Sequence, residues 1–100
     1  MAQLTIIWWR DIPAQVTARA GRITAKRALP QRFQEAVDRA AMRGNARDTD
    51  AYLAQWRRGA PAPCGDDLEA AVAAEAERLE RGFDDARLAA LVANGGHAPA

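Results

Sequence analysis

Bulky apolar residues fill both alternating faces of the first segment of the chain, and this pattern predicts a buried β-strand. Residues Gln3 to Trp9 read QLTIIWW, a segment rich in the β-branched and aromatic residues that favour strands. Successive side chains of a strand point to opposite faces of a sheet, so Trp8 and Trp9 are expected on opposite faces. Because both faces carry bulk, we expect this strand to be central or covered on both sides.

The next segments predict that the first strand belongs to a small antiparallel sheet. Pro13 breaks the alternating pattern, and the segment from Ala14 to Arg19 then predicts a second strand with Val16 facing the core. Gly21 supplies a tight turn, because glycine tolerates positive φ angles. Residues Ile23 to Ala28 predict either a third short strand or the approach to a helix.

From residue 30 onwards, apolar residues recur at three- and four-residue intervals, which predicts a run of helices. Asp residues that precede the apolar stretches are expected to cap the helix N-termini with their carboxylates. The expected elements are a helix that starts at Pro30 and ends at Gly44-Asn45, a helix from Thr49 to Arg57 capped by Asp48, a stiff connector from Ala60 to Pro63, a helix from Asp67 to about Arg81 capped by Asp66, and a short helix capped by Asp84.

Together these elements predict one α+β domain, in which an N-terminal β-hairpin or small three-stranded antiparallel sheet is packed by three to four helices. The domain is expected over residues 3–93, and residues 94–100 are expected to form a disordered tail because Asn94-Gly95-Gly96 stops the last helix. A chain of 100 residues supports one modest core, without room for a deep substrate cavity as well.

Charge is divided unevenly along the chain. Residues 1–58 carry eleven Lys and Arg against five acids, a net charge of +6, whereas residues 59–100 carry three Arg against eight acids, a net charge of −5. The asymmetry has two interpretations: the basic half binds an anionic partner, or the acidic helix packs beside the basic part and the two fields largely cancel.

The cysteine and histidine content excludes several kinds of site. With one cysteine, Cys64, an intramolecular disulfide is impossible, and one histidine leaves too few ligands for a Cys/His zinc site. Cys64 precedes a predicted helix start, where a reactive thiolate could form, but two adjacent acids oppose this and His97 is the only histidine base. We therefore expect no cofactor or metal and no enzyme activity, and treat Cys64 as either a loop cysteine or a redox or ligand contact.

No signal peptide or membrane span is apparent, so a cytoplasmic location is expected.

Six residues are candidate binding residues. Arg22, Lys26 and Arg27 cluster after the Gly21 turn and form either a solvated edge, a site for a small anion or protein, or a weak nucleic-acid site. Trp9 is a candidate interface anchor, because one of two adjacent tryptophans can enter the core and the other is covered by a helix, by a partner or by nothing. Arg10 pairs with its neighbour Asp11 or reaches a carboxylate on a ligand or partner. Cys64 is the sixth candidate.

Four segments resemble the small bacterial "virulence factor" domain family: TIIWWRDIPAQV, AKRALPQRFQEAVDRAAM, DTDAYLAQWRR and PCGDDLEA. The resemblance covers roughly Leu4 to Leu91 and extends to the C-terminal module of conserved virulence factor C proteins of Gram-positive bacteria. It implies no mechanism and no catalytic residues. Stand-alone versions of the domain resemble companions of folate and corrinoid one-carbon enzymes, which implies an accessory role.

These observations lead to one principal hypothesis and two alternatives. The principal hypothesis is a non-catalytic accessory module that binds a separately encoded protein, such as a one-carbon metabolism enzyme, through the basic hairpin and an exposed apolar residue such as Trp9. The first alternative is a subunit that binds a small anionic ligand or a folate-like cofactor through Arg22, Lys26 and Arg27. The second alternative is weak nucleic-acid binding through the same patch.

Overall fold

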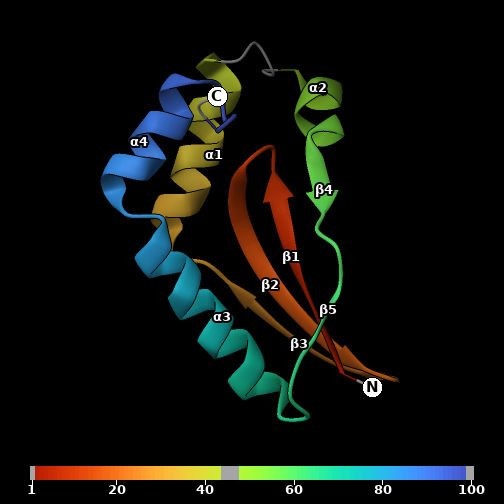
Figure 1. Cartoon of the computed structure of the whole chain (residues 1–100). Coiled ribbons are helices and arrows are strands. Elements are labelled where there is room, and N and C mark those ends of the chain that lie inside the picture. Colours follow the sequence, from red (N-terminus) through yellow and green to blue (C-terminus); the bar gives the residue numbers. More distant parts are fainter. Residues whose placement is uncertain (1, 44–47, 99–100) are drawn as a thin grey trace.

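The computed structural model describes residues 2–43 and 48–98, and within these ranges the chain forms an antiparallel sheet and four helices (Figure 1). This arrangement confirms the predicted α+β class, and the N-terminal three strands form the antiparallel sheet that the sequence predicts. The strands are β1 (Gln3–Trp9), β2 (Ile12–Ala20), β3 (Ile23–Ala28), β4 (Trp56–Arg58) and β5 (Ala62–Pro63), and the helices are α1 (Gln31–Arg43), α2 (Thr49–Ala54), α3 (Leu68–Gly82) and α4 (Asp85–Ala93).

The sheet has the strand order β3-β2-β1-β4, and β5 also pairs with β1. Ile6 pairs with Val16 and Ile7 with Gln15, but Trp8 pairs with Pro13, so the register shifts between Ile7 and Trp8. The second strand, expected to start at Ala14, begins at Ile12 and includes Pro13, while the irregular pairing lies where Pro13 was expected to break the pattern. A proline is tolerated within a strand where a bulge interrupts the regular hydrogen bonds.

The helices α1, α3 and α4 lie on one side of the sheet (Figure 1). Helix α3 packs against β2 and β3, and α1 packs against β2 and α4. Val16 and Ala18 of β2 are fully buried beneath these helices. The core consists mainly of apolar side chains from β2, α1, α3 and α4, including Ile12, Val16, Phe33, Val37, Val72, Leu79 and Leu88.

Aspartate side chains cap three helices. Asp48 accepts a hydrogen bond from Ala51 N at 2.9 Å, as predicted, and Asp84 accepts one from Arg87 N at 2.8 Å. For α3, the prediction of Asp66 was wrong by one residue. The cap is Asp67, whose carboxylate accepts from the N–H of Ala70 at 3.1 Å. The predicted end of α1 at Gly44-Asn45 lies outside the described residues.

The segment after α2 differs most from the sequence prediction. The helix expected to run to Arg57 ends at Ala54, and Trp56–Arg58 forms β4 against the free edge of β1. The connector also joins the sheet, because Ala62–Pro63 pairs with Gln3 and Leu4 as β5. Pairing with the β1 edge thus overrides the local helical pattern, as tertiary contacts often do.

Trp9 is fully buried, so the expectation of an exposed Trp9 was wrong. Its indole N–H donates to the carbonyl of Tyr52 at 2.9 Å, and the two rings lie 5.8 Å apart. Of the tail expected over residues 94–100, residues 99 and 100 lie outside the described residues, whereas Gly95 and Gly96 pack back onto this region. Asp11 N donates to the Gly96 carbonyl at 2.8 Å, and both Gly95 and Gly96 are buried.

The substitution Gly96→Ala is expected to destabilise the fold. Gly96 has a φ of +94°, and a Cβ atom there would lie 2.9 Å from Cζ3 of Trp9. Backbone strain and overpacking should together lower the free energy of unfolding by about 1 to 3 kcal/mol. Urea denaturation measures the change. Gly65→Ala is the control, because nothing lies within 4 Å of a Cβ at that position. Equal unfolding midpoints for the two variants would contradict this account.

Candidate functional site

A row of apolar side chains on β1 remains only partly covered by the helices. Leu4 and Ile6 share the helix-facing side of the sheet with their β2 partners Ala18 and Val16, and strand alternation places Trp8 on the same side. Because α3 packs on β2 and β3, the β2 residues are fully buried, whereas Leu4, Ile6 and Trp8 are only half-buried. The first strand therefore presents an accessible apolar surface.

This surface forms the floor of a groove between β1 and α3, here called the β1 groove. Its cavity of about 330 Å³ is lined by Leu4, Ile6, Trp8, Gly59, Ala60, Ala62, Glu75 and Arg78. Gly59 allows the chain to pass close to Trp8, because a Cβ at Gly59 would lie 3.1 Å from the indole nitrogen. On the α3 wall, Glu75 and Arg78 form an ion pair, and the hydrogen bonds that the Arg78 guanidinium donates to the Glu75 carboxylate raise the pKa of Arg78 above its ordinary value.

Trp8 also lines a second cavity, here called the Trp8 pocket, so this one side chain takes part in both the β1 groove and the pocket. The pocket has a volume of about 410 Å³ and is lined by Trp8, Asp11, Arg57, Phe83, Arg87, Ala90, Leu91 and Ala98. The rings of Trp8 and Phe83 meet edge to face, with centroids 6.2 Å apart. Strand β1, the α3–α4 turn and helix α4 together build this aromatic corner.

Two arginines of the pocket stack on these aromatic rings. The guanidinium of Arg57 lies 5.3 Å from the Trp8 ring centroid, and that of Arg87 lies 3.8 Å from the Phe83 centroid. Arg57 also donates to Asp11 Oδ1 at 3.2 Å. Cations over aromatic faces are attracted by the ring quadrupole, so both side chains are held in place at the pocket.

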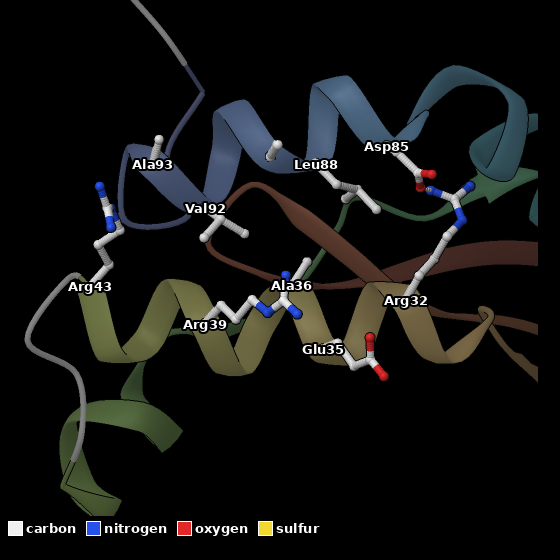
Figure 2. A pocket seen from close by; sticks show the side chains of 10 residues that line it. Arg32, Glu35, Ala36, Arg39, Arg43, Asp85, Leu88, Val92 and Ala93 are labelled. Atoms are coloured by element: carbon white, nitrogen blue, oxygen red, sulfur yellow. Dashed lines mark hydrogen bonds and ion pairs between the residues drawn. The ribbon is translucent and has the colours of Figure 1, made fainter.

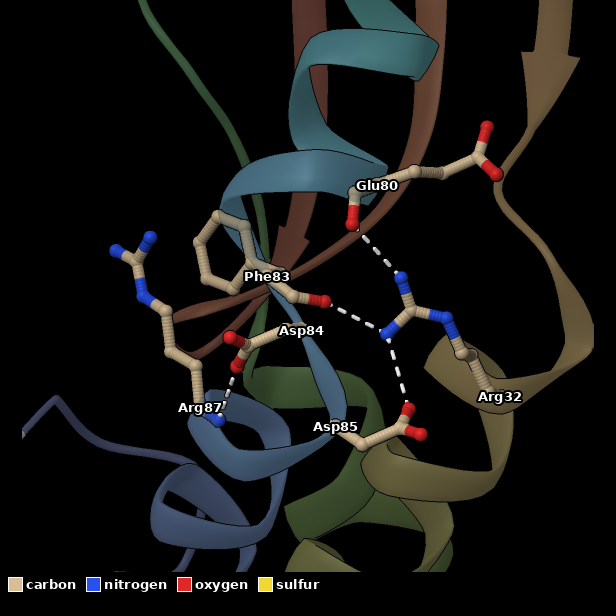
Figure 3. Close-up of polar contacts among 6 residues, drawn as sticks. All are labelled: Arg32, Glu80, Phe83, Asp84, Asp85 and Arg87. Carbon is tan, nitrogen blue, oxygen red and sulfur yellow. Dashed lines mark hydrogen bonds and ion pairs between the residues drawn. The ribbon is translucent and has the colours of Figure 1, made fainter.

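Arg32 of α1 fixes the turn that carries Phe83 (Figure 3). Its Nη1 donates to the Phe83 carbonyl at 2.6 Å, and its Nη2 donates to the Glu80 carbonyl at 2.8 Å. The same guanidinium lies 3.5 Å from the carboxylate of Asp85. Carbonyl groups at a helix C-terminus lack helical partners and carry partial negative charge, so a cation is favourable here.

A second groove lies between α1 and α4 (Figure 2). Its cavity of about 420 Å³ is lined by Arg32, Glu35, Ala36, Arg39, Arg43, Asp85, Leu88, Ala89, Val92 and Ala93. The lining mixes both signs of charge with mostly small apolar side chains. It offers no aromatic surface among its described lining residues, so the Trp8 pocket is the stronger candidate for a binding site.

The basic residues predicted from the sequence lie elsewhere. Arg22, Lys26 and Arg27 are exposed at the β2–β3 hairpin. Lys26 pairs with Thr17 and Arg27 with Val16, so their side chains point to opposite faces of the sheet edge. None of the three lines a cavity described above, and their role in binding a ligand stays a prediction. Charged side chains on an edge strand also discourage pairing with other chains.

Arg10 does not form the local pair considered from the sequence. Its Nη1 donates to the Gly95 carbonyl at 2.6 Å and its Nε donates to Gln55 Oε1 at 3.2 Å, while Asp11 pairs with Arg57. Arg10 has a φ of +52° and lies 4.9 Å from the Trp9 ring centroid. Its observed contacts therefore serve the β1–β2 turn and the buried Trp9.

Cys64 is half-buried at the margin of the core, and its backbone N–H donates to the Ala2 carbonyl at 3.2 Å.

Within residues 2–43 and 48–98, no group of three or more His, Cys, Asp or Glu side chains is arranged to hold a metal ion. No helix in these ranges combines the length and apolar content needed to cross a membrane.

The fold and the pocket define a small α+β domain with an aromatic, arginine-lined groove. A family model described as "Virulence factor" matches residues 7–92, which is most of the chain and includes every aromatic and arginine residue of the Trp8 pocket. The chain therefore belongs to the Virulence factor family, as its sequence motifs indicated. Comparisons with curated proteins and with solved structures give no match.

Removal of the Arg32 guanidinium is expected to loosen the α3–α4 turn. The substitution Arg32→Ala should lower the free energy of unfolding by about 1 to 3 kcal/mol, because two helix-end carbonyl groups lose a charged donor. Arg39→Ala, an exposed position on the same helix, is the control and should change stability by less than about 0.5 kcal/mol. Thermal unfolding followed by circular dichroism measures both, and a similar loss in the two variants would argue against this role.

Proposed function

We propose that this domain is a non-catalytic accessory module that binds a separately encoded protein partner through the Trp8 pocket and the β1 groove. The observation that carries the proposal is the half-buried row of Leu4, Ile6 and Trp8, which α3 leaves accessible and which ends at two stacked arginines. Tryptophan and arginine are enriched among the residues that dominate binding energy at protein interfaces. A groove along a strand also suits an extended segment of a partner better than a compact small molecule.

Asp11 is the only carboxylate among the described residues of the Trp8 pocket, and its contacts support a non-catalytic role for the domain. Asp11 Oδ1 accepts from Arg57 at 3.2 Å, and Asp11 Oδ2 accepts from the N–H of Ala98 at 2.6 Å. Both oxygens therefore take part in contacts that hold Asp11 to β4 and to the segment after α4, which fits a structural role for this carboxylate.

The resemblance of stand-alone family members to companions of one-carbon enzymes identifies the class of partner to test first. A cytoplasmic location is part of this proposal, since the single cysteine excludes an intramolecular disulfide. The hairpin that carries Arg22, Lys26 and Arg27 remains a secondary contact surface in this proposal, because these residues are exposed but line none of the cavities described above.

The substitution Trp8→Ala is expected to reduce partner capture at least about tenfold, the effect typical of an interface residue whose removal costs more than about 1.4 kcal/mol. A tagged copy is used to capture proteins from lysate of the source cells, and quantitative mass spectrometry compares the variant with the unmodified chain. Leu53→Ala is the control, because Leu53 is 57% exposed but lies outside both cavities.

A folded state of the Trp8→Ala variant is checked by its circular dichroism spectrum. A stoichiometric partner that is lost with Trp8→Ala and retained with Leu53→Ala supports the proposal. Equal capture by the two variants, or no stoichiometric partner at low salt, would argue against it.

A further inference from the structure

We infer that the Trp8 pocket recognises a carboxylate adjacent to an apolar side chain on the partner segment. This inference rests on the proposed function and adds the chemistry of the bound group. The carboxylate is either the C-terminus of the partner or an acidic side chain next to an apolar residue. The two sources share the same recognition chemistry, and the experiment below distinguishes them.

The charge balance of the pocket favours an incoming anion. Arg57 of β4 and Arg87 of α4 both line the cavity, whereas Asp11 is the one carboxylate among its described lining residues. Asp11 is shared between Arg57 and the backbone N–H of Ala98. A second carboxylate would therefore neutralise the remaining positive charge in a partly enclosed site, where charge-assisted hydrogen bonds are stronger than in open water.

Both arginines are already oriented by contacts to the protein backbone. Arg57 Nε donates to the Arg10 carbonyl at 3.1 Å, and Arg87 Nη1 donates to the Gly82 carbonyl at 2.9 Å. Considering the described residues alone, Arg57 Nη1 and Arg87 Nη2 make no hydrogen bond. A guanidinium carries five N–H donors, so each side chain can be held in place and still donate to a ligand. Such preorganisation reduces the entropy lost on binding.

The remaining lining requires that the carboxylate be attached to an apolar group. Trp8, Phe83, Ala90 and Leu91 supply aromatic and aliphatic surface, and the cavity of about 410 Å³ lies within the usual size range of ligand pockets. A fully hydrated anion would leave this surface unused. A phosphate would also place up to two negative charges beside Asp11, so a carboxylate fits better.

The pocket and the β1 groove share Trp8 as a lining residue, and the presence of an apolar groove beside the pocket favours a polypeptide over a free small acid. From the indole ring, the apolar floor extends along Ile6 and Leu4 between α3 and the β4–β5 connection. A peptide whose carboxylate lies between Arg57 and Arg87 can place its neighbouring residues along this floor. The groove thus provides a path for the chain that carries the carboxylate.

Fragment binding followed by NMR tests the inference without knowledge of the partner. The probes are N-acetylphenylalanine, which has a terminal carboxylate, the C-terminal α-amide of N-acetyl-phenylalanyl-aspartic acid, which has only a side-chain carboxylate, the neutral N-acetylphenylalaninamide, and inorganic phosphate. We expect at least one carboxylate probe to shift the Trp8 indole signal saturably at millimolar concentration, with an affinity at least about tenfold above that of the neutral amide. The more tightly bound carboxylate identifies the source.

Charge-removing variants assign the effect to the two arginines. Arg57→Gln and Arg87→Gln should each abolish the preference for carboxylate over amide. Arg58→Gln is the matched control, because Arg58 follows Arg57 on β4 but points to the opposite face of the sheet. The indole signal of Trp9, whose N–H is bonded to the Tyr52 carbonyl, should stay unchanged in all variants and reports an intact fold.

Several results would overturn the inference. These are equal binding of acid and amide, no saturable shift with either carboxylate, tighter binding of phosphate, or an equal loss of preference with Arg58→Gln. If partner capture still depends on Trp8 but is unaffected by the Arg57→Gln, Arg87→Gln double variant, the carboxylate inference fails while the proposed function stands. If Trp8→Ala leaves partner capture unchanged, the proposed function itself fails.

Discussion

The hydrogen bonds from the Arg32 guanidinium to the end of α3 are the interaction on which the candidate site depends. Arg32 belongs to α1, yet it satisfies the carbonyl groups of Glu80 and Phe83 at 2.8 Å and 2.6 Å (Figure 3). These bonds join α1 to the turn between α3 and α4. The ring of Phe83 is thereby held against Trp8, and Arg87 is held over Phe83. The aromatic corner of the pocket follows from this one contact between distant segments.

The unequal coverage of the sheet explains why the site lies on β1. Helix α3 packs on β2 and β3, where Val16, Ala18 and Ala25 are buried, while β4 and β5 extend the far edge of β1 with only short pairings. Leu4, Ile6 and Trp8 are thus flanked by chain on both sides but left without a helix directly above them. Apolar area contributes to stability in proportion to the amount removed from water. The buried side chains of the other elements supply most of this area, so the core can remain stable although the β1 row stays partly exposed.

Several features could be predicted from local patterns, and others could not. The β1 strand, the α+β class and two of the three aspartate caps follow from side-chain alternation, helical periodicity and the chemistry of capping. The helical pattern around Trp56 and Arg57 was misleading, because pairing with β1 stabilises this segment more than continuation of α2 would. The same limit separates the candidate residues chosen from the sequence from those that line the candidate pocket. The sequence pointed to Trp9 and the hairpin arginines, whereas the pocket contains Trp8, Arg57 and Arg87.

By itself, the sequence determined the kinds of elements, their approximate order and the family to which the chain belongs, because these depend on residue types at short spacing. It also determined that Trp8 and Trp9 lie on opposite faces of one strand. Only the tertiary structure decided that α2 and residues 95–96 cover Trp9 while Trp8 stays accessible. The physical reason is that burial depends on which distant segments pack over a face, and no local pattern in β1 specifies those segments.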